Sequence, residues 1–228
     1  MENKLSHPSN YLKPEWIQAI RNNSMGAEKL GCLHPAHLQL IYDQQWFKLF
    51  VPKDYGGLEV SLPDVIRLEE SLAWADGSVG WTVTLCAGAG WFGGFLAPGR
   101  GKEIFADPKV CLGGSGAPSG TATVTDNGFS ITGRWKYATG ASHTTHFTAN
   151  CMIKNGSENV IDDDGKPLML PFVFDKKDVT IIADWDTTGL VATGSHSFAL
   201  NELNVSRDNS FKIAAEDAFF ANCIYKYP

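Results

Sequence analysis

The hydrophobic period of this sequence changes near Pro108, and this change constrains the fold more than any other feature. Before Pro108, apolar residues recur at the three- and four-residue spacing of amphipathic helices, whereas after it short β-rich runs alternate with turn residues. The sequence therefore predicts an α+β protein. We expect an N-terminal helical bundle over residues 1–107, an antiparallel β-barrel or sandwich over 108–206, and the start of a further helical region over 207–228.

About five helices are expected in the first part. Pro14 opens the first, which fades at Asn22 and Asn23, and a second begins near Pro35. Ser61 is the expected N-cap of a third helix, which ends near residues 76–77. A short helix over residues 99–106 closes this part.

The segment from Ser78 to Ala97 carries no charge over twenty residues, which is long enough for a membrane span. However, it is rich in glycine and contains Thr82 and Thr84, so the segment as a whole is only modestly apolar. We therefore interpret it as a buried helix and expect no membrane association.

Beyond Pro108, strands are predicted at roughly 110–118, 121–126, 128–134, 145–153, 170–174, 179–183 and 194–203. The stretch 155–166, with its acidic run 162–164, is predicted to be an exposed loop, because it lacks the alternating ligand spacing of a calcium-binding loop. Residues 214–225 return to a helical pattern.

Composition narrows the classes of function. The net charge of −6, without any basic run, argues against a nucleic-acid partner. Five widely spaced cysteines, an odd number without a CxxC pair, indicate reduced thiols and a cytoplasmic location, and the N-terminus has no signal-peptide pattern. The groups Cys32, His34, His37 and His143, His146 do not provide four zinc ligands at a convincing spacing, so no metal site is predicted.

The segment 133–140, GRWKYATG, is the strongest candidate for a ligand site. It follows a strand-like run and places Trp135, Tyr137 and Thr139 at alternate positions, which predicts that they share one face of a sheet. An aromatic plane beside a hydroxyl suits a flat ligand with a polar edge. The alternative is that aromatic residues and Thr are simply common in strands. The glycine-rich run 113–116 offers a second possibility, backbone N–H groups that bind a phosphate.

Three segments in order resemble motifs of the acyl-CoA dehydrogenase superfamily. Residues 51–57, VPKDYGG, are similar to its P-x-x-Y-G-G link between N-terminal helices, and residues 133–140 are similar to its G-x-K-x-W-[IF]-[TS]-[NG] segment. Residues 184–190 with 193–195 resemble its W-x-x-x-G-[LM]-R-x-[TS]-x-[ST] run. The resemblance covers the helical and strand parts, and so nearly the whole chain.

This resemblance implies a flavin site that holds FAD or FMN, with Tyr137 at the family's aromatic position and Thr139 at its hydroxyl position. The implied cofactor-binding residues are Ser115, Gly116, Tyr137, Thr139 and Gly140. Two departures matter. The dehydrogenases' T-E-P-x-x-G-S-D flavin loop is replaced by residues 116–121 without Glu or Asp, and Val191 stands where the family has Arg. Both bring the chain closer to the flavin-dependent monooxygenases of the same fold.

Family members continue into a C-terminal four-helix domain that closes the flavin site, and this sequence ends at Pro228, where that domain is expected to begin. No residue is therefore assigned as the catalytic base, and we expect flavin to be weakly held or absent. The resemblance implies an acyl-CoA dehydrogenase-like flavin-dependent oxidoreductase that is incomplete as it stands. The alternatives are a flavin-dependent monooxygenase, or a non-catalytic remnant or interaction module. The expected substrate is a small molecule, either an acyl-CoA or an aromatic compound.

A cluster of large apolar residues near the C-terminus, most of them aromatic, has few expected neighbours to bury it. We therefore expect it to lie on an exposed apolar surface that mediates a homo-oligomer or docks a separate subunit. The alternative is that the terminal helix packs on the strand part of its own chain. The cluster consists of Phe211, Phe219, Phe220, Ile224 and Tyr225.

Overall fold

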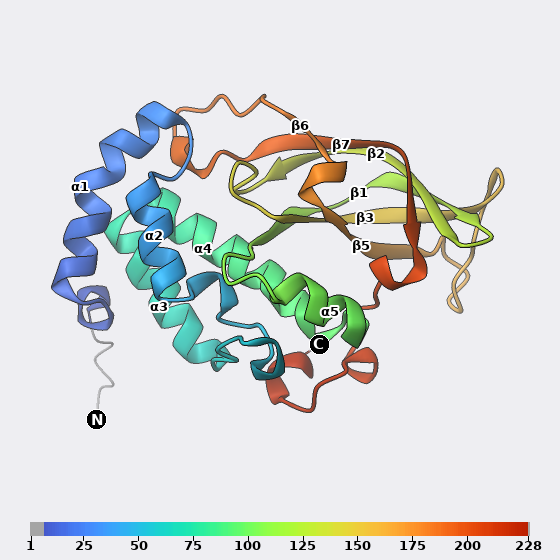
Figure 1. The fold of residues 1–228 in the computed structure, drawn as a ribbon, viewed down its shortest axis with the longest axis horizontal. Coiled ribbons are helices and arrows are strands. Elements are labelled where there is room, and N and C mark those ends of the chain that lie inside the picture. Colours follow the sequence, from blue (N-terminus) through green and yellow to red (C-terminus); the bar gives the residue numbers. More distant parts are fainter. Residues whose placement is uncertain (1–6, 228) are drawn as a thin grey trace.

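The fold has a helical part and a β part. The chain passes from the helical part into the β part and, after the last strand, returns to the helical part (Figure 1). The computed structural model describes residues 7–227. Figure 1 shows the helices gathered at one end of the molecule and the strands at the other, with the last segment returning across the helical part. The expectation that no signal peptide opens the chain rests partly on residues 1–6, which lie outside the described residues.

The five expected helices are present, and proline occupies the first turn of four of them. They are α1 (Pro14–Leu30), α2 (Pro35–Asp43), α3 (Leu62–Ala75), α4 (Gly77–Gly90) and α5 (Pro98–Phe105). Helix α1 continues past Asn22 and Asn23, which is longer than predicted. The Asn23 side chain donates to the carbonyl of Ala19 within the helix, and the helix ends where Gly31 takes a left-handed conformation.

Helix α4 contains most of the uncharged segment from Ser78 to Ala97, which is long enough for a membrane span but is interpreted from the sequence as a buried helix. It has only 14 residues, and among the described residues no helix is long and apolar enough to cross a membrane. A Cβ on Gly80 would lie 2.4 Å from the Cα atom of Ala73, so this glycine allows α3 and α4 to pack closely. Helix α4 thereby forms the centre of the helical core, with Val79, Val83 and Cys86 fully buried.

The β part is one seven-stranded sheet in the order β4-β3-β1-β2-β7-β6, with β5 also paired to β3. Its strands are β1 (Leu112–Thr125), β2 (Gly128–Ala138), β3 (His146–Asn155), β4 (Glu158–Asn159), β5 (Met169–Asp175), β6 (Thr180–Ile182) and β7 (His196–Ser206). The predicted runs 110–118 and 121–126 form the single strand β1. The acidic run 162–164 lies in a turn, where the Asp162 carboxylate accepts the backbone N–H groups of Asp164 and Lys166.

The prediction of a purely antiparallel sheet is wrong for one pair, because β1 and β3 run parallel. Strands β1 and β2 form an antiparallel hairpin, and residues 139–145 then carry the chain to the other edge of β1 instead of the free edge of β2. Strand β3 therefore runs in the same direction as β1. Strand positions along a sequence do not specify which strands become neighbours.

The sheet is strongly curled around its own core. Strands β2 and β5 are separated by β1 and β3, so in a flat sheet they would lie about 14 Å apart. Instead the rings of Phe129 on β2 and Phe172 on β5 lie 5.2 Å apart, edge to face. This core is separate from the helical one, which agrees with a helical part followed by a β part. The division at residue 108 stays a prediction.

The expected terminal helix is absent over residues 214–225, which form two short 3-10 turns joined by irregular chain with bends. The backbone in this segment bonds to the helical part: the N–H of Phe219 donates to Gly94, and the carbonyl of Ile224 accepts from the indole of Trp91. Contacts with α4 and the turn after it therefore replace the local helical pattern.

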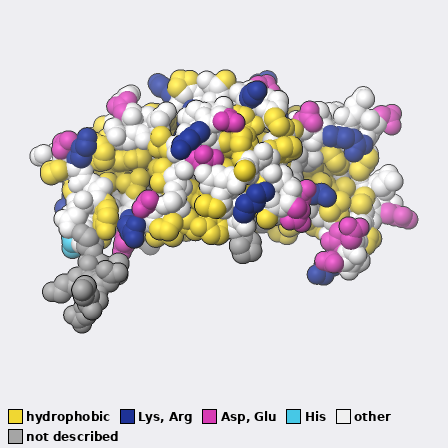
Figure 2. Space-filling model, turned by 90° about the horizontal axis from the view of Figure 1, so that it is seen from below, with side chains coloured by type: hydrophobic (Ala, Val, Ile, Leu, Met, Phe, Trp, Pro, Cys, Tyr) yellow, Lys and Arg dark blue, Asp and Glu magenta, His cyan; other side chains and the backbone are white. Residues whose placement is uncertain are grey.

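Most of this C-terminal cluster of large apolar residues is buried by the chain itself, contrary to the expectation of few neighbours. Phe211, Ile224 and Tyr225 are buried in the helical core, and the Tyr225 hydroxyl donates to the carbonyl of Phe50. The backbone N–H of Phe211 also bonds to the strand part, where it donates to the carbonyl of Pro171 on β5. Phe219 remains 55% exposed. Figure 2 shows further hydrophobic side chains on the lower face of the molecule, between scattered charged groups.

Candidate functional site

A cavity of about 310 Å³ lies between α4 and the first halves of β1 and β3. Helix α4 and the turn after it provide one wall, strands β1 and β3 provide the other, and Ile213 of the C-terminal segment closes one side. The lining is mainly apolar. The lining residues are Thr84, Leu85, Gly88, Ala89, Phe92, Gly113, Gly114, Ser115, Gly116, Thr139, Thr148, Ala149, Asn150, Pro171 and Ile213.

The β1 wall is built from glycine because strand β3 approaches it closely. A Cβ on Gly114 would lie 1.8 Å from the carbonyl oxygen of Thr148, so no side chain fits there. The pairing of β1 with β3 then breaks between Ser115 and Gly120, and the Asn150 amide donates to the carbonyl of Gly116 across the break. This irregularity coincides with the segment where the dehydrogenase flavin loop is replaced.

The predicted shared face of Trp135, Tyr137 and Thr139 is wrong. Pairing between β2 and β7 is irregular between Trp135 and Ala138, and Tyr137 has a φ of +66°, which breaks the alternation of side chains. Trp135 consequently belongs to the β core: it is fully buried, stacks on Phe198 and donates its indole N–H to the carbonyl of Asn150.

Tyr137, by contrast, points out of the sheet and is 68% exposed. A positive φ is uncommon for a bulky residue, and backbone strain of this kind is concentrated at functional sites. The Tyr137 ring meets the ring of Trp185 edge to face, with centroids 6.2 Å apart. The two rings border a small hollow whose other lining residues include Ser195 and Asp184.

A chain of hydroxyl groups links this hollow to the main cavity, because Ser195 lines the hollow and Thr139 lines the cavity. The Thr139 hydroxyl lies 3.0 Å from that of Ser195, and the Ser195 hydroxyl lies 2.8 Å from that of Thr193. Thr193 donates to the carbonyl of Leu190 at 2.9 Å, and the indole N–H of Trp81 donates to Thr139 at 3.2 Å.

The hydrogen bonds at the two ends of this chain of hydroxyl groups fix which hydroxyl donates to which. Each hydroxyl has one proton, and that of Thr193 is used on a carbonyl, so Ser195 must donate to Thr193. Thr139 must then donate to Ser195, because the Ser195 proton is already used. The Thr139 oxygen accepts from Trp81 and keeps one further lone pair, so to any further group Thr139 offers a hydrogen-bond acceptor and no donor.

A carboxyl group lies behind the α4 wall. Burial raises the pKa of Glu69 on α3 to about 6, and a hydrogen bond with the cavity residue Thr84 partly opposes this rise. The Glu69 Oε1 atom is buried without a hydrogen-bond partner.

The structure thus brings three of the five predicted cofactor-binding residues to one cavity: Ser115, Gly116 and Thr139. Tyr137 borders the adjoining hollow, and Gly140 is buried behind Thr139, where its N–H donates to the carbonyl of Thr193. The parts played by Trp81, Asn150 and Ser195 were not predicted from the sequence. Only Ser195 carried a signal, because it lies in one of the three motif-like segments.

No protein-family model matches the chain. Its relatives include an indole-3-acetate monooxygenase of Acinetobacter baumannii, 29% identical over 183 residues, which cover 80% of this chain and 45% of the relative. They also include a pigment production hydroxylase of Rhodococcus, 30% identical over 156 residues, or 68% of this chain and 38% of the relative. The chain therefore spans less than half the length of these curated relatives.

Solved structures with the same fold are also found. The 3-HSA hydroxylase of Rhodococcus matches with a TM-score of 0.82 at 22% identity, covering 98% of this chain and 58% of that one. XiaF of Streptomyces, solved with FADH2 and glycerol, matches with a TM-score of 0.76 at 24% identity, covering 92% of this chain and 50% of that one.

The chain has the fold of the first half of the acyl-CoA dehydrogenase-like monooxygenases, a helical part followed by a mixed β-sheet part. The relatives found by sequence are the monooxygenase and the hydroxylase named above, together with a flavin-dependent monooxygenase oxygenase subunit of Mycobacterium tuberculosis, 27% identical over 193 residues, which cover 84% of this chain and 47% of the relative. The comparisons therefore favour the monooxygenase alternative over the dehydrogenase interpretation given first from the sequence.

Proposed function

We propose that this chain provides the flavin-binding wall and part of the substrate pocket of a flavin-dependent monooxygenase that acts on a small aromatic compound. The observation that carries the proposal is the Thr139 hydroxyl, fixed by Trp81 and Ser195 as an acceptor on the wall of an apolar cavity. Similarity to monooxygenases supports the reaction class.

The residues present fit a flavin. Its ring system is flat and apolar on its faces, with hydrogen-bonding atoms along its edges. The exposed ring of Tyr137 offers an apolar contact, and Thr139 offers a hydrogen bond to an edge. A Cβ on Gly116 would meet nothing within 4 Å, so the β1 wall leaves open space beside Ser115 for a bulky group.

The apolar lining of the cavity favours an aromatic substrate over a charged one. Leu85, Ala89 and Phe92 line the α4 side, and the polar side chains of Thr148 and Asn150 lie on the β3 side. A volume of about 310 Å³ is at the small end of ligand sites. Relatives named for aromatic compounds, such as the indole-3-acetate monooxygenase, support this substrate class.

When bound, reduced flavin supplies the electrons for oxygen activation. The protein's own part is positional and electrostatic. Thr139 orients the ring through one hydrogen bond, and Ser195 holds the Thr139 proton in a hydrogen bond. The apolar side chains of α4 exclude water from the reacting groups. The described residues supply no side chain to which we assign the role of catalytic base.

Flavin binding by the chain itself tests the proposal. We expect FMN or FAD to quench the protein's tryptophan fluorescence weakly, and Thr139→Ala to weaken binding by about fivefold, the value of one neutral hydrogen bond. The matched control is Thr180→Ala, an exposed strand position outside both cavities, which should bind as the wild type does. Absence of binding at all flavin concentrations would favour a non-catalytic interaction module.

Oxygenase activity tests the second half of the proposal. The chain is joined to a C-terminal domain taken from a relative, and reduced flavin is supplied with indole or another small aromatic compound. We expect oxygen consumption that yields a hydroxylated product. Bleaching of the flavin by an acyl-CoA without oxygen would instead support a dehydrogenase.

A further inference from the structure

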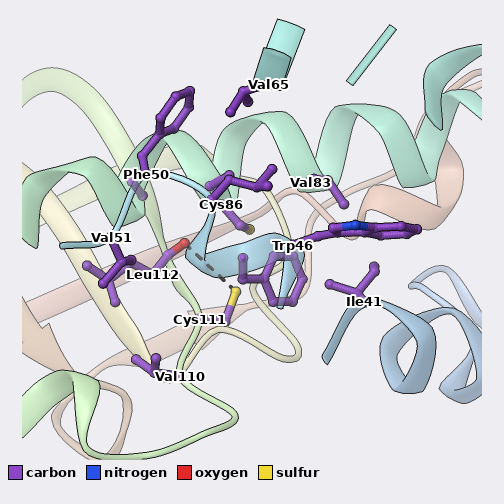
Figure 3. Close-up of a cluster of buried hydrophobic side chains, with 14 of the residues drawn as sticks. Ile41, Trp46, Phe50, Val51, Val65, Val83, Cys86, Val110, Cys111 and Leu112 are labelled. Atoms are coloured by element: carbon purple, nitrogen blue, oxygen red, sulfur yellow. Dashed lines mark hydrogen bonds between the residues drawn. The ribbon is translucent and has the colours of Figure 1, made fainter. Parts of the chain in front are cut away.

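A buried cluster of two cysteines and one histidine lies behind the candidate site and takes no part in it. Among residues 7–227, Cys86, Cys111 and His143 form one group whose ligand atoms all lie within 4.8 Å of one another. Cys86 comes from α4, Cys111 precedes β1, and His143 lies in the connection between β2 and β3. Figure 3 shows Cys86 and Cys111 close together in the helical core.

The surrounding structure fixes these three residues. The backbone of Cys111 is held from both sides by Thr145, whose hydroxyl accepts its N–H and whose N–H donates to its carbonyl. The ring of His143 stacks on that of Phe47, with centroids 5.5 Å apart and planes inclined by 10°. The three elements are therefore held in place without a bound ion.

The space around the cluster is shaped by a glycine. A Cβ on Gly140 would lie 2.6 Å from the Nε2 atom of His143 and 3.4 Å from the sulfur of Cys86. The Nε2 atom is buried, and no hydrogen bond of ordinary geometry reaches it. An imidazole nitrogen placed in this way is free to act as a metal ligand.

The two thiols differ in acidity. The hydrogen bond from Cys111 lowers the pKa of Cys86 despite its burial, and His143 contributes in the same direction. Burial raises the pKa of Cys111. Zinc binding displaces the protons of both thiols.

We propose that Cys86, Cys111 and His143 provide three ligands of a buried zinc site, whose fourth position is filled by a water molecule. Zinc is bound by Cys sulfur at about 2.3 Å and His nitrogen at about 2.0 Å, which in a tetrahedron places ligand atoms about 3.5–3.8 Å apart. The observed separations of up to 4.8 Å need only a small contraction. Two thiolates and a neutral imidazole also cancel the charge of Zn²⁺, which matters because both sulfurs are fully buried.

Such an ion would link the two parts of the fold, since α4 belongs to the helical part and His143 to the β part. This inference does not depend on the proposed flavin site. Its ligands line neither the main cavity nor the smaller hollow.

Titration with Zn²⁺ tests the site, in a background in which Cys32 and Cys223 are replaced by Ser. Binding is measured by competition with a chromophoric chelator, and Co²⁺ is used as a second probe because its thiolate charge-transfer and d–d bands report ligand type and geometry. We expect one ion per chain and a rise in Tm on binding.

His143→Gln and Cys111→Ser should each weaken Zn²⁺ binding by more than the roughly 10–100-fold that loss of an outer-shell partner causes. Cys151→Ser is the matched control, because Cys151 is equally buried but lies in the β core. It should bind as the background protein does. Because a variant can lose stability for other reasons, the readout is the difference in Tm with and without Zn²⁺ within each folded variant.

Two results would overturn the proposal. One is the absence of stoichiometric binding in the background protein. The other is unchanged affinity in both His143→Gln and Cys111→Ser. A Cys86–Cys111 disulfide that forms in air even with Zn²⁺ present would count as the first result, since it removes both sulfur ligands.

Discussion

The direction of the hydroxyl chain predicts that the site prefers reduced over oxidised flavin. Thr139 offers any further group an acceptor only, because its proton is donated to Ser195. Fully reduced flavin carries N–H groups on ring nitrogens that are bare acceptors in the oxidised form. The reduced ring can therefore donate to Thr139, whereas the oxidised ring would place two acceptors against each other.

One net neutral hydrogen bond contributes about 1 kcal/mol, which corresponds to about a fivefold change in Kd. The two redox states of the flavin also differ in charge and shape. The quantity to compare between the wild type and each variant is therefore the ratio of the Kd for oxidised flavin to the Kd for reduced flavin. We expect Thr139→Val to reduce the preference for reduced flavin by about fivefold. Ser195→Ala should reduce it further, because the freed Thr139 proton can then turn to the cavity and favour the oxidised ring.

The assay is an anaerobic titration with reduced FMN and an aerobic one with oxidised FMN, both followed by tryptophan fluorescence. Thr180→Val is the control for a Thr→Val change at an exposed strand position. If the Kd ratio is the same within twofold in the wild type, Thr139→Val and Ser195→Ala, the deduced direction of the hydroxyl chain does not govern binding.

Two further predictions concern stability. Glu69 has a pKa of about 6 in the folded protein and about 4.3 in the unfolded chain, so its contribution to the free energy of unfolding is fully present below about pH 4.3 and is lost as pH rises through about 6. Glu69→Gln should therefore raise the free energy of unfolding at pH 8 by up to about 1 kcal/mol, measured by urea titration. The change Glu70→Gln at the exposed neighbouring residue should not. Tyr225→Phe removes the hydrogen bond to the carbonyl of Phe50 and should cost about 1–2 kcal/mol in thermal unfolding, whereas Tyr227→Phe, at a 45% exposed position, should be neutral, and equal effects would contradict the assigned role of the buried bond.

Most elements of the fold were predictable because their signals are local. Proline at the helix starts, the glycine and asparagine turn before β2 and the alternation of apolar residues act within a few residues of the chain. Strand pairing was not predictable in the same way. The parallel pairing of β1 and β3 depends on the path of residues 139–145 around the end of β1.

The features of the candidate site likewise fall into those that local sequence predicted and those that depend on contacts between distant segments. The motif-like segments pointed to Thr139, Ser115 and Gly116, which meet in one cavity. They did not reveal that Tyr137 leaves the face of Trp135, because a positive φ and irregular pairing are set by the neighbouring strand β7. The direction of the Thr139 proton depends on Trp81 and Ser195, each more than 50 residues away in sequence.

The sequence alone therefore determined the order of helices and strands and the residue types available to a flavin, since both depend on local pattern and side-chain chemistry. Tertiary structure decided what each of those residues does. It buried Trp135 in the core, exposed Tyr137, packed the last segment on the helical part, and assembled Cys86, Cys111 and His143 from three distant segments. The physical reason is that hydrogen-bond direction, burial and ligand geometry are properties of groups in contact, and contacts between distant segments exist only after folding.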